Sequence, residues 1–345
     1  MTSTGAGAWT HPGAFEVAPG VHRVPLPLPN DGLRAVNIYV LETADGLVLV
    51  DAGWAIPAAR ELLEQALGSL GFGLADVRRF LVTHVHRDHY TQAVTVRREF
   101  GTHVGLGVGE RPTMEVLQQP HRPLSTQAEH LRVLGADALA QEVDQMMGHA
   151  QNDPSHWELP DQWLVEGPVA LPGGRTLEAV ATPGHTAGHL VFHDLEGQVL
   201  FAGDHVLPTI TPSIGFEPVL SPNPLGDFLA SLALVRRRPD ALLLPAHGDV
   251  APSVHVRVDE LIAFHGSRLE ETERAVQAGA CTPHEVAGQL RWTRREHRLA
   301  DLDTFNAMLA TFETGAHLVL LEAQGRLTRT LVDGVDHYAD GSPAT

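Results

Sequence analysis

The sequence predicts an α/β protein in which two β-sheets stack on each other and helices cover their outer faces. A meander of short strands followed by strand–helix units occurs twice, over residues 17–106 and again from residue 163. Several buried-strand patterns also end directly in His, Asp or Gly, and α/β scaffolds place their chemistry at the carboxyl ends of strands. We therefore expect a functional site along one edge, between the two halves of the repeated pattern.

The composition indicates a folded globular protein. The 345 residues are 43% hydrophobic and carry a formal net charge of −18, which argues against a general nucleic-acid binder. Cys281 is the only cysteine, so an intrachain disulfide and a thiolate metal site are excluded. Because we find no apolar signal segment and no apolar run long enough to span a bilayer, we expect a cytoplasmic protein without a membrane partner.

The first half of the chain is expected to start with a flexible leader over residues 1–16. Three candidate strands follow, at 20–25, 36–41 and 47–50. Ala44-Asp45-Gly46 is a hairpin turn signal between the last two strands. Residues 58–70 have the apolar spacing of a helix that precedes the next strand.

Metal-competent side chains follow the next strands. The third strand runs into Asp51, and the apolar run Phe80-Leu81-Val82 predicts a buried strand that ends at Thr83. Residues 84–89 then hold three histidines and one aspartate. Imidazole nitrogens and carboxylate oxygens are ligands that suit zinc or a similar first-row metal.

Residues 107–165 interrupt this rhythm and are expected to form a helical insert, which is too long for a plain connection between strands. Helices are predicted at 111–118, 125–134 and 138–148, with a loop at 149–156. The apolar residues of the insert could line a pocket, although the packing face of the helices is the simpler interpretation. These residues are Met114, Leu117, Leu131, Leu134, Met146, Met147 and Trp157.

Three strands of the second half each deliver one more metal-competent side chain at the carboxyl end, beside a glycine. These side chains are His185, Asp204 and His247. His205, next to Asp204, could donate a proton to a leaving group or could be hydrogen-bonded behind the site, and we favour the second interpretation.

A helical appendage with winged-helix character is predicted over residues 253–332. Its helices are expected at 258–278, 283–292 and 305–323. Thr282 is a plausible N-cap for the second helix, and residues 325–330 would form a small strand. Residues 333–345 are expected to be a polar tail.

Five motifs occur in order, each at the end of a predicted strand. They are Val50-Asp51-Ala52-Gly53, His84-x-His86-x-Asp88-His89, Pro183-Gly184-His185-Thr186, Gly203-Asp204 and His247-Gly248. Together they resemble the metallo-β-lactamase-fold hydrolases over residues 17–252, which implies an αββα four-layer sandwich. The appendage resembles, more loosely, the winged segment of lactamase-beta-like endoribonucleases.

The resemblance implies a dinuclear metal site. His84, His86 and His185 would hold the first metal, Asp88, His89 and His247 the second, and Asp204 would bridge them. Two Zn²⁺ ions are expected, with iron or manganese as alternatives. A hydroxide between two such ions is a strong nucleophile near neutral pH, and Asp88 would orient it. Asp51 would hydrogen-bond a ligand histidine and fix its tautomer.

Three features qualify the resemblance. Tyr90 stands where relatives often carry a small residue; its hydroxyl could contact substrate, or the residue could simply begin the helix. No Cys occupies a ligand position, unlike in some true β-lactamases. His86 takes the place of a Glu found in di-iron electron-transfer relatives, which favours dizinc hydrolysis.

Three functions follow. Hydrolysis of an ester, thioester or lactone in a small acyl substrate is preferred, because the spacing is glyoxalase-II-like and the surface acidic. Phosphodiester cleavage of RNA is the second. The segment 291–298, with four Arg and one Trp, could grip phosphates and stack a base, although the net charge disfavours this. The third is a mononuclear-iron oxidoreductase like the persulfide dioxygenases. The sequence is also compatible with a homodimer.

Overall fold

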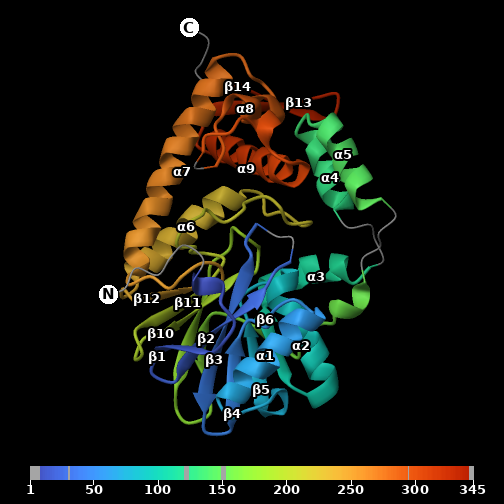
Figure 1. Cartoon of the computed structure of the whole chain (residues 1–345). Helices are drawn as coiled ribbons and strands as arrows, with labels where there is room; N and C mark the ends of the chain where they lie inside the picture. The colour runs from blue at the N-terminus through green and yellow to red at the C-terminus, as the bar shows by residue number, and fades with distance from the viewer. Residues whose placement is uncertain (1–7, 30–31, 120–123, 149–152, 294, 342–345) are drawn as a thin grey trace. The chain divides into compact units, whose positions relative to one another are not determined.

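The computed structural model describes residues 8–29, 32–119, 124–148, 153–293 and 295–341 (Figure 1). The start of the predicted leader, the first half of the loop predicted at 149–156 and Arg294 lie outside these ranges. The chain divides into two units. Unit 1 comprises residues 1–118, 153–212 and 231–259, and unit 2 comprises residues 119–152, 213–230 and 260–345.

A seven-stranded sheet, which we call sheet A, forms the first half of unit 1, and its strands lie in chain order. They are β1 (Phe15–Ala18), β2 (Val21–Pro27), β3 (Ala35–Thr43), β4 (Gly46–Val50), β5 (Val77–Val82), β6 (His103–Gly107) and β7 (Gln162–Leu164). The first four strands pair antiparallel and the last four parallel. β1 begins inside the predicted leader, where Phe15 pairs with Arg23.

Five strands form sheet B in the order β12-β11-β10-β9-β8. They are β8 (Gly167–Ala170), β9 (Thr176–Ala181), β10 (Leu190–Asp194), β11 (Val199–Gly203) and β12 (Leu242–Pro245). β11 and β12 pair parallel, and the other neighbours pair antiparallel. Both sheets therefore contain the parallel pairs whose strand ends the sequence marks with His and Asp.

The four residues from Leu47 to Val50 pack on both faces of sheet A. Successive side chains of a strand point to opposite faces. Leu47 and Leu49 pack in the cluster formed with α1 (Pro57–Ser69) and α2 (Arg87–Phe100), whereas Val48 and Val50 pack between the sheets. Burial on both faces explains the uninterrupted apolar run of β4.

The outer face of sheet B is covered by α6 (Pro224–Arg237), whose second half belongs to unit 1. Ser231 Oγ at this half donates to Pro183 O at 2.9 Å, and Arg238 Nε donates to His193 Nδ1 of β10 at 3.2 Å. The layers of unit 1 are thus helix, sheet, sheet and helix. This confirms the predicted fold class.

Unit 2 is mostly helical and combines part of the predicted insert with the C-terminal segment. Its helices are α4 (Ser125–Val133), α5 (Asp137–Met147), most of α7 (Val254–Gln277), α8 (Pro283–Gln289) and α9 (Thr304–Ala323). Thr304 Oγ1 donates to Glu142 of α5, and His284 N donates to Leu134 O after α4. The insert therefore splits, because α3 (Arg111–Leu117) belongs to unit 1.

The apolar residues of the insert are divided in the same way. Met114 and Trp157 are buried in the core of unit 1. Leu134 lines an apolar pocket of about 290 Å³ in unit 2, together with Val133 and Phe312. Met146 is 46% exposed. The buried members of the predicted set, Met114, Leu131 and Trp157, thus serve packing, and Leu134 is the described member of that set that lines the pocket.

The tail predicted from residue 333 is ordered through Asp340, because β13 (Leu327–Val332) and β14 (Val335–Asp340) form an antiparallel hairpin. Its two-residue turn is Asp333-Gly334, with φ angles of 49° and 83°. Positive φ at both central residues defines the hairpin turn that Asp-Gly favours. Asp333-Gly334 is thus a hairpin turn signal inside the segment whose polarity predicted a tail.

The Trp292 side chain is buried, 6% exposed, whereas the alternative in which the segment 291–298 binds RNA needs it on the surface. Its Nε1 donates to Ala287 O at 2.9 Å, and the Arg268 guanidinium carbon lies 4.6 Å from the ring centroid. The second predicted helix ends at Gln289, with Thr282 capping its start as expected. Trp292 is therefore a core residue of unit 2, and its burial argues against the possibility that it stacks on a base.

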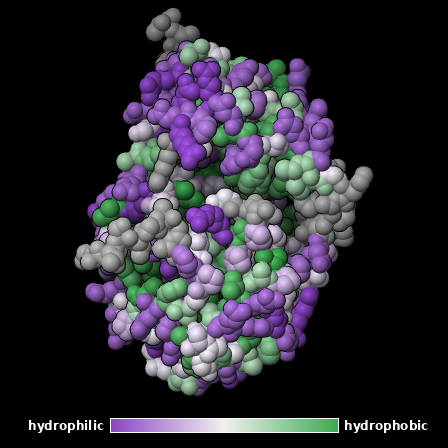
Figure 2. Space-filling view, in the orientation of Figure 1, coloured by the Kyte–Doolittle hydropathy of each residue, from purple (hydrophilic) through white to green (hydrophobic). Residues whose placement is uncertain are grey.

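Hydrophilic side chains cover much of the face in Figure 2, with hydrophobic ones interspersed. Within the described ranges, no helix combines the length and the apolar character needed to cross a bilayer.

The burial of β4 on both faces gives a stability prediction. Leu49→Ala should lower the free energy of unfolding of unit 1 by about 2–5 kcal/mol, because a fully buried side chain would leave a cavity. Leu195→Ala, at a position 47% exposed, should change it by less than about 0.5 kcal/mol. Urea unfolding followed by tryptophan fluorescence measures both, and equal losses would contradict the layer assignment.

Candidate metal centre

Residues from both sheets of unit 1 meet at one edge. His84 and His86 follow β5, and Asp88 and His89 lie in the first turn of α2. His185 follows β9, Asp204 follows β11 and His247 follows β12. All seven predicted ligands are therefore brought together, five of them in loops that follow strands and two in the first turn of α2.

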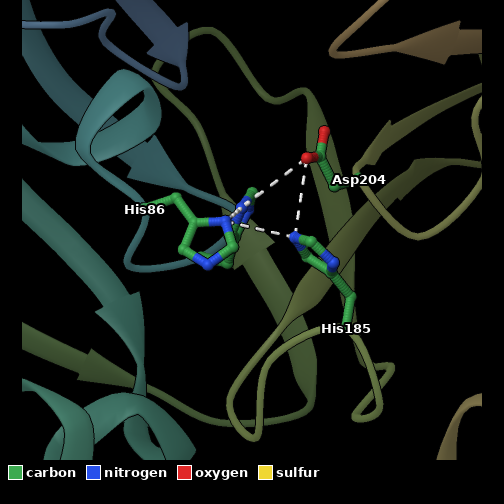
Figure 3. A group of neighbouring side chains, drawn as sticks. His86, His185 and Asp204 are labelled. Carbon is green, nitrogen blue, oxygen red and sulfur yellow. Dashed lines mark hydrogen bonds and ion pairs between the residues drawn. The ribbon is translucent and has the colours of Figure 1, made fainter. Parts of the chain in front are cut away.

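The first group consists of His84, His86, His185 and Asp204. The His86 Nδ1 atom lies 3.0 Å from His84 Nε2 and 3.2 Å from His185 Nε2. His185 Nε2 lies 3.5 Å from Asp204 Oδ2 (Figure 3). Two nitrogens bound to one tetrahedral zinc lie about 3.3 Å apart, so this spacing is that of ligands around a single ion.

The second group consists of Asp88, His89 and His247. The Asp88 Oδ2 atom lies 3.6 Å from His89 Nε2 and 3.5 Å from His247 Nε2. Asp204 Oδ1 lies 3.3 Å from His247 Nε2 and 3.8 Å from His89 Nε2. Asp204 thus directs one carboxylate oxygen to each group.

Three atoms of this centre are buried without a hydrogen-bond partner in the described part of the chain: His89 Nε2, His247 Nε2 and Asp204 Oδ1. A buried polar atom left unsatisfied costs about 1–3 kcal/mol. All three face the second group, where a cation would satisfy them together. The donor set of imidazole and carboxylate is the one that divalent first-row metals prefer.

Asp51 orients two of the histidines, His89 directly and His84 through Thr83. Its Oδ2 accepts from His89 Nδ1 at 2.9 Å, and its Oδ1 accepts from Thr83 N and Thr83 Oγ1 at 2.8 and 2.9 Å. Thr83 Oγ1 lies 3.1 Å from His84 Nδ1 and accepts its proton. Both rings therefore present Nε2 to the centre. The predicted hydrogen bond between Asp51 and a candidate ligand histidine is confirmed, with His89 as the donor.

Strand β3 fixes the loop that carries His247. The ring donates Nδ1–H to Ala35 O at 2.7 Å. Asn37 Nδ2 donates to Pro245 O and Gly248 O, and the Tyr39 hydroxyl donates to Pro245 O at 2.8 Å. Sequence reasoning missed both Asn37 and Tyr39, because nothing in an apolar strand pattern shows which strand end its polar side chains will face.

His189, which directly precedes β10, is a further residue at this edge. Its Nε2 accepts the backbone N–H of Asp204 at 3.2 Å, and its Nδ1 lies 2.9 Å from Thr182 Oγ1. Its ring stacks on His84 with centroids 5.1 Å apart. A Cβ at Gly203 would lie 2.7 Å from His189 Nε2, so this contact requires the glycine. The available signal was a His placed four residues after His185.

The two groups differ in electrostatics. Burial, reinforced by the neighbouring histidines, holds the pKa of His84 well below its ordinary value, so its lone pair is free to coordinate. Burial also lowers the pKa of His89, but the carboxylates of Asp51, Asp88 and Asp204 outweigh it and raise that pKa to about 10. Three converging carboxylates therefore make the second group a strong site for positive charge.

Two predicted catalytic side chains, those of Tyr90 and His205, are buried in the protein. Tyr90 is fully buried, stacks on Trp157 and donates its hydroxyl to Glu158 O, so the structure corrects the predicted substrate contact. His205 is also fully buried, and burial lowers its pKa to about 3. A neutral imidazole of this kind does not supply a proton at neutral pH, which speaks against the proton-donor role.

Named relatives resemble this chain over most of its length. A probable metallo-hydrolase, YqjP, from Bacillus subtilis (strain 168) is 24% identical over 89% of this chain and 92% of that protein. The atrochrysone carboxyl ACP thioesterase nsrC from Aspergillus novofumigatus is 25% identical over 77% of this chain. This chain spans 65% of the thioesterase's length.

Solved structures and a family model agree with these matches. A beta-lactamase domain protein from Burkholderia ambifaria is 29% identical, with a TM-score of 0.78, over 98% of this chain and 95% of that chain. A metallo-beta-lactamase family protein from Thermus thermophilus is 28% identical, with a TM-score of 0.71, over 94% of this chain and 100% of that chain. The family model described as the metallo-beta-lactamase superfamily matches residues 31–247. The chain belongs to the metallo-β-lactamase superfamily.

Proposed function

We propose that the chain is a dinuclear metal-dependent hydrolase, with two Zn²⁺ ions, that cleaves an acyl bond and in particular a thioester. The observation that carries this proposal is the Asp204 carboxylate, which directs Oδ2 to one group of ligands and Oδ1 to the other. A carboxylate placed in this way suits a bridge between two ions.

A complete second group supports two metals over one. His84, His86 and His185 would hold the first ion; Asp88, His89 and His247 would hold the second. A mononuclear-iron oxidoreductase would leave the second group without an ion, and its buried nitrogens without a partner. The three carboxylates of Asp51, Asp88 and Asp204 offset three of the four positive charges of two divalent ions.

The bound metals would supply an activated water near neutral pH and an electrophile for the carbonyl oxygen. Asp88 is suited to orient that water and accept its proton. Its side chain is 13% exposed, against 3% for Asp51, so water can reach it. Burial raises its pKa, but His89 and His247 outweigh this and keep it below its ordinary value, so the carboxylate is ionised.

The named thioesterase among the relatives supports an acyl substrate over RNA. The formal charge of −18 disfavours a polyanionic substrate, since phosphate contacts dominate nucleic-acid affinity. The burial of Trp292 removes the aromatic platform expected of the segment 291–298. A thioester therefore ranks before an ester, a lactone and a phosphodiester.

His84→Ala should abolish hydrolysis of an N-acetylcysteamine thioester, lowering kcat/KM at least about 10³-fold, because the first ion would lose a ligand. Removing metal from the wild type with a chelator should have the same effect, and Zn²⁺ should restore activity. Metal content by mass spectrometry and rates on thioester, lactone and phosphodiester probes test this. His11→Ala, at an exposed position, is the matched control and should retain full activity.

Two results would overturn this proposal. Dominant, His84-dependent cleavage of the phosphodiester probe would replace the acyl substrate with a nucleotide or RNA. One iron per chain, with no hydrolysis of any probe, would favour the oxidoreductase.

Asp51→Asn should weaken Zn²⁺ binding about 10–100-fold, because the partner behind a ligand histidine tunes its orientation and basicity. Asparagine is the suitable replacement, since residue 51 has a φ of 61° and Asn tolerates left-handed backbone. Competition with a chromophoric chelator measures the affinity, and Asp45→Asn, on an exposed turn, is the control. An unchanged affinity would show that Asp51 only supports the backbone.

A further inference from the structure

A second cluster of metal-competent side chains lies inside unit 2, formed by His265 of α7 and by Glu313 and His317 of α9. Glu313 and His317 are four residues apart and therefore share one face of α9. One candidate ligand atom from each side chain lies within 4.8 Å of the others. We propose that these three residues bind one divalent transition-metal ion, Zn²⁺ by its donor preference, at a site separate from the centre in unit 1.

The two imidazoles face each other at the spacing of ligands. His265 Nδ1 lies 3.2 Å from His317 Nε2. His317 donates its Nδ1–H to Glu313 O at 2.7 Å, which leaves the lone pair of Nε2 directed at His265. The same 3.2 Å separates His86 Nδ1 from His185 Nε2 in unit 1, and two nitrogens on one tetrahedral zinc lie about 3.3 Å apart.

The surroundings of the cluster offer its side chains few polar partners. Within the described part of the chain, His265 Nε2, the ring nitrogen opposite the one that faces His317, is buried without a hydrogen bond. Glu313 is half-buried, and Arg268 acts on its carboxylate through its charge. The surroundings are apolar, since His265 packs edge-on against Phe228 and Phe264 with ring centroids 5.5 and 5.2 Å away. An ionised carboxylate in such apolar surroundings is costly unless a cation or a proton neutralises it.

Arg268, the positive side chain whose charge acts on Glu313, is bound to other groups through both of its Nη atoms. Arg268 Nη1 donates to Glu271 at 2.9 Å, and its Nη2 donates to Arg291 O at 2.7 Å. Its guanidinium also stacks on Trp292. Arg268 therefore acts on Glu313 only through its field.

The protonation states suit coordination. Burial lowers the pKa of His265 to about 3 and that of His317 to about 4, so both imidazoles are neutral. Burial raises the pKa of Glu313 to about 7, against the opposing field of Arg268. A divalent ion would displace the Glu313 proton, since metal binding releases protons from its ligands.

Two neutral imidazoles and one carboxylate form a donor set that zinc accepts, with a fourth position left for water. The ligands come from α7 and α9, so the ion would cross-link two helices of unit 2 whose ligand histidines are 52 residues apart in sequence. Its effect would be on the stability of this unit, because a ligand that binds only the folded state stabilises it.

The test compares full-length proteins that are depleted of metal, reconstituted with Zn²⁺ alone and measured for zinc per chain by mass spectrometry. The double variant His265→Gln/His317→Gln should bind one equivalent less than wild type, and chelation should lower its melting temperature less. His284→Gln, a half-buried histidine of the same unit near Thr311 Oγ1, is the matched control and should bind as wild type does. Thioester hydrolysis should be the same in all three proteins.

Equal zinc in wild type and double variant would overturn the site, whatever the centre in unit 1 binds. If the double variant does not fold, Glu313→Gln and anomalous scattering at the zinc edge from wild-type crystals decide the matter. A peak beside His265 and His317 is expected, and its absence leaves the cluster as a hydrogen-bonded histidine pair next to a protonated Glu313.

Discussion

The buried carboxylate of Asp204 is the constraint around which unit 1 is arranged. Burial alone would raise its pKa, yet His247 and His89 hold it well below the ordinary value, so the group is ionised inside the protein. An ionised buried carboxylate is tolerated only if opposite charge surrounds it. His89 comes from α2, which follows β5 of sheet A, and His247 comes from the loop after β12 of sheet B, so both halves of unit 1 are needed to meet this requirement.

Tight packing around Gly203 holds Asp204 in place. Its backbone N–H donates to His189, whose ring is stacked on His84 and lies against Gly203. A side chain at position 203 would collide with His189 and Thr83, both within 2.8 Å of its Cβ. The glycine of the Gly203-Asp204 motif therefore has a packing reason that is independent of any metal.

The ligands were predictable from sequence because His and Asp are chemically distinctive where an apolar strand ends. The residues that position them were not predictable in this way. Asn37 and Tyr39 lie in a strand pattern that specifies burial, but the sheet register that points them at Pro245 and Gly248 arises only on folding. Contacts between segments far apart in the chain are equally invisible to local patterns, as where His284 N donates to Leu134 O within unit 2.

The histidines of the two units show why residue type alone does not identify a metal site. Beside three carboxylates, His89 has a raised pKa, whereas His265, among aromatic rings and beside the field of Arg268, has a lowered one. In the first surroundings a metal ion must displace protons from imidazole; in the second it must displace a proton from Glu313. Both clusters favour metal over protons as the pH rises, but different groups release the protons. The arrangement of carboxylates around each imidazole comes from tertiary packing. It therefore determines which side chain would lose a proton when each site binds a metal ion.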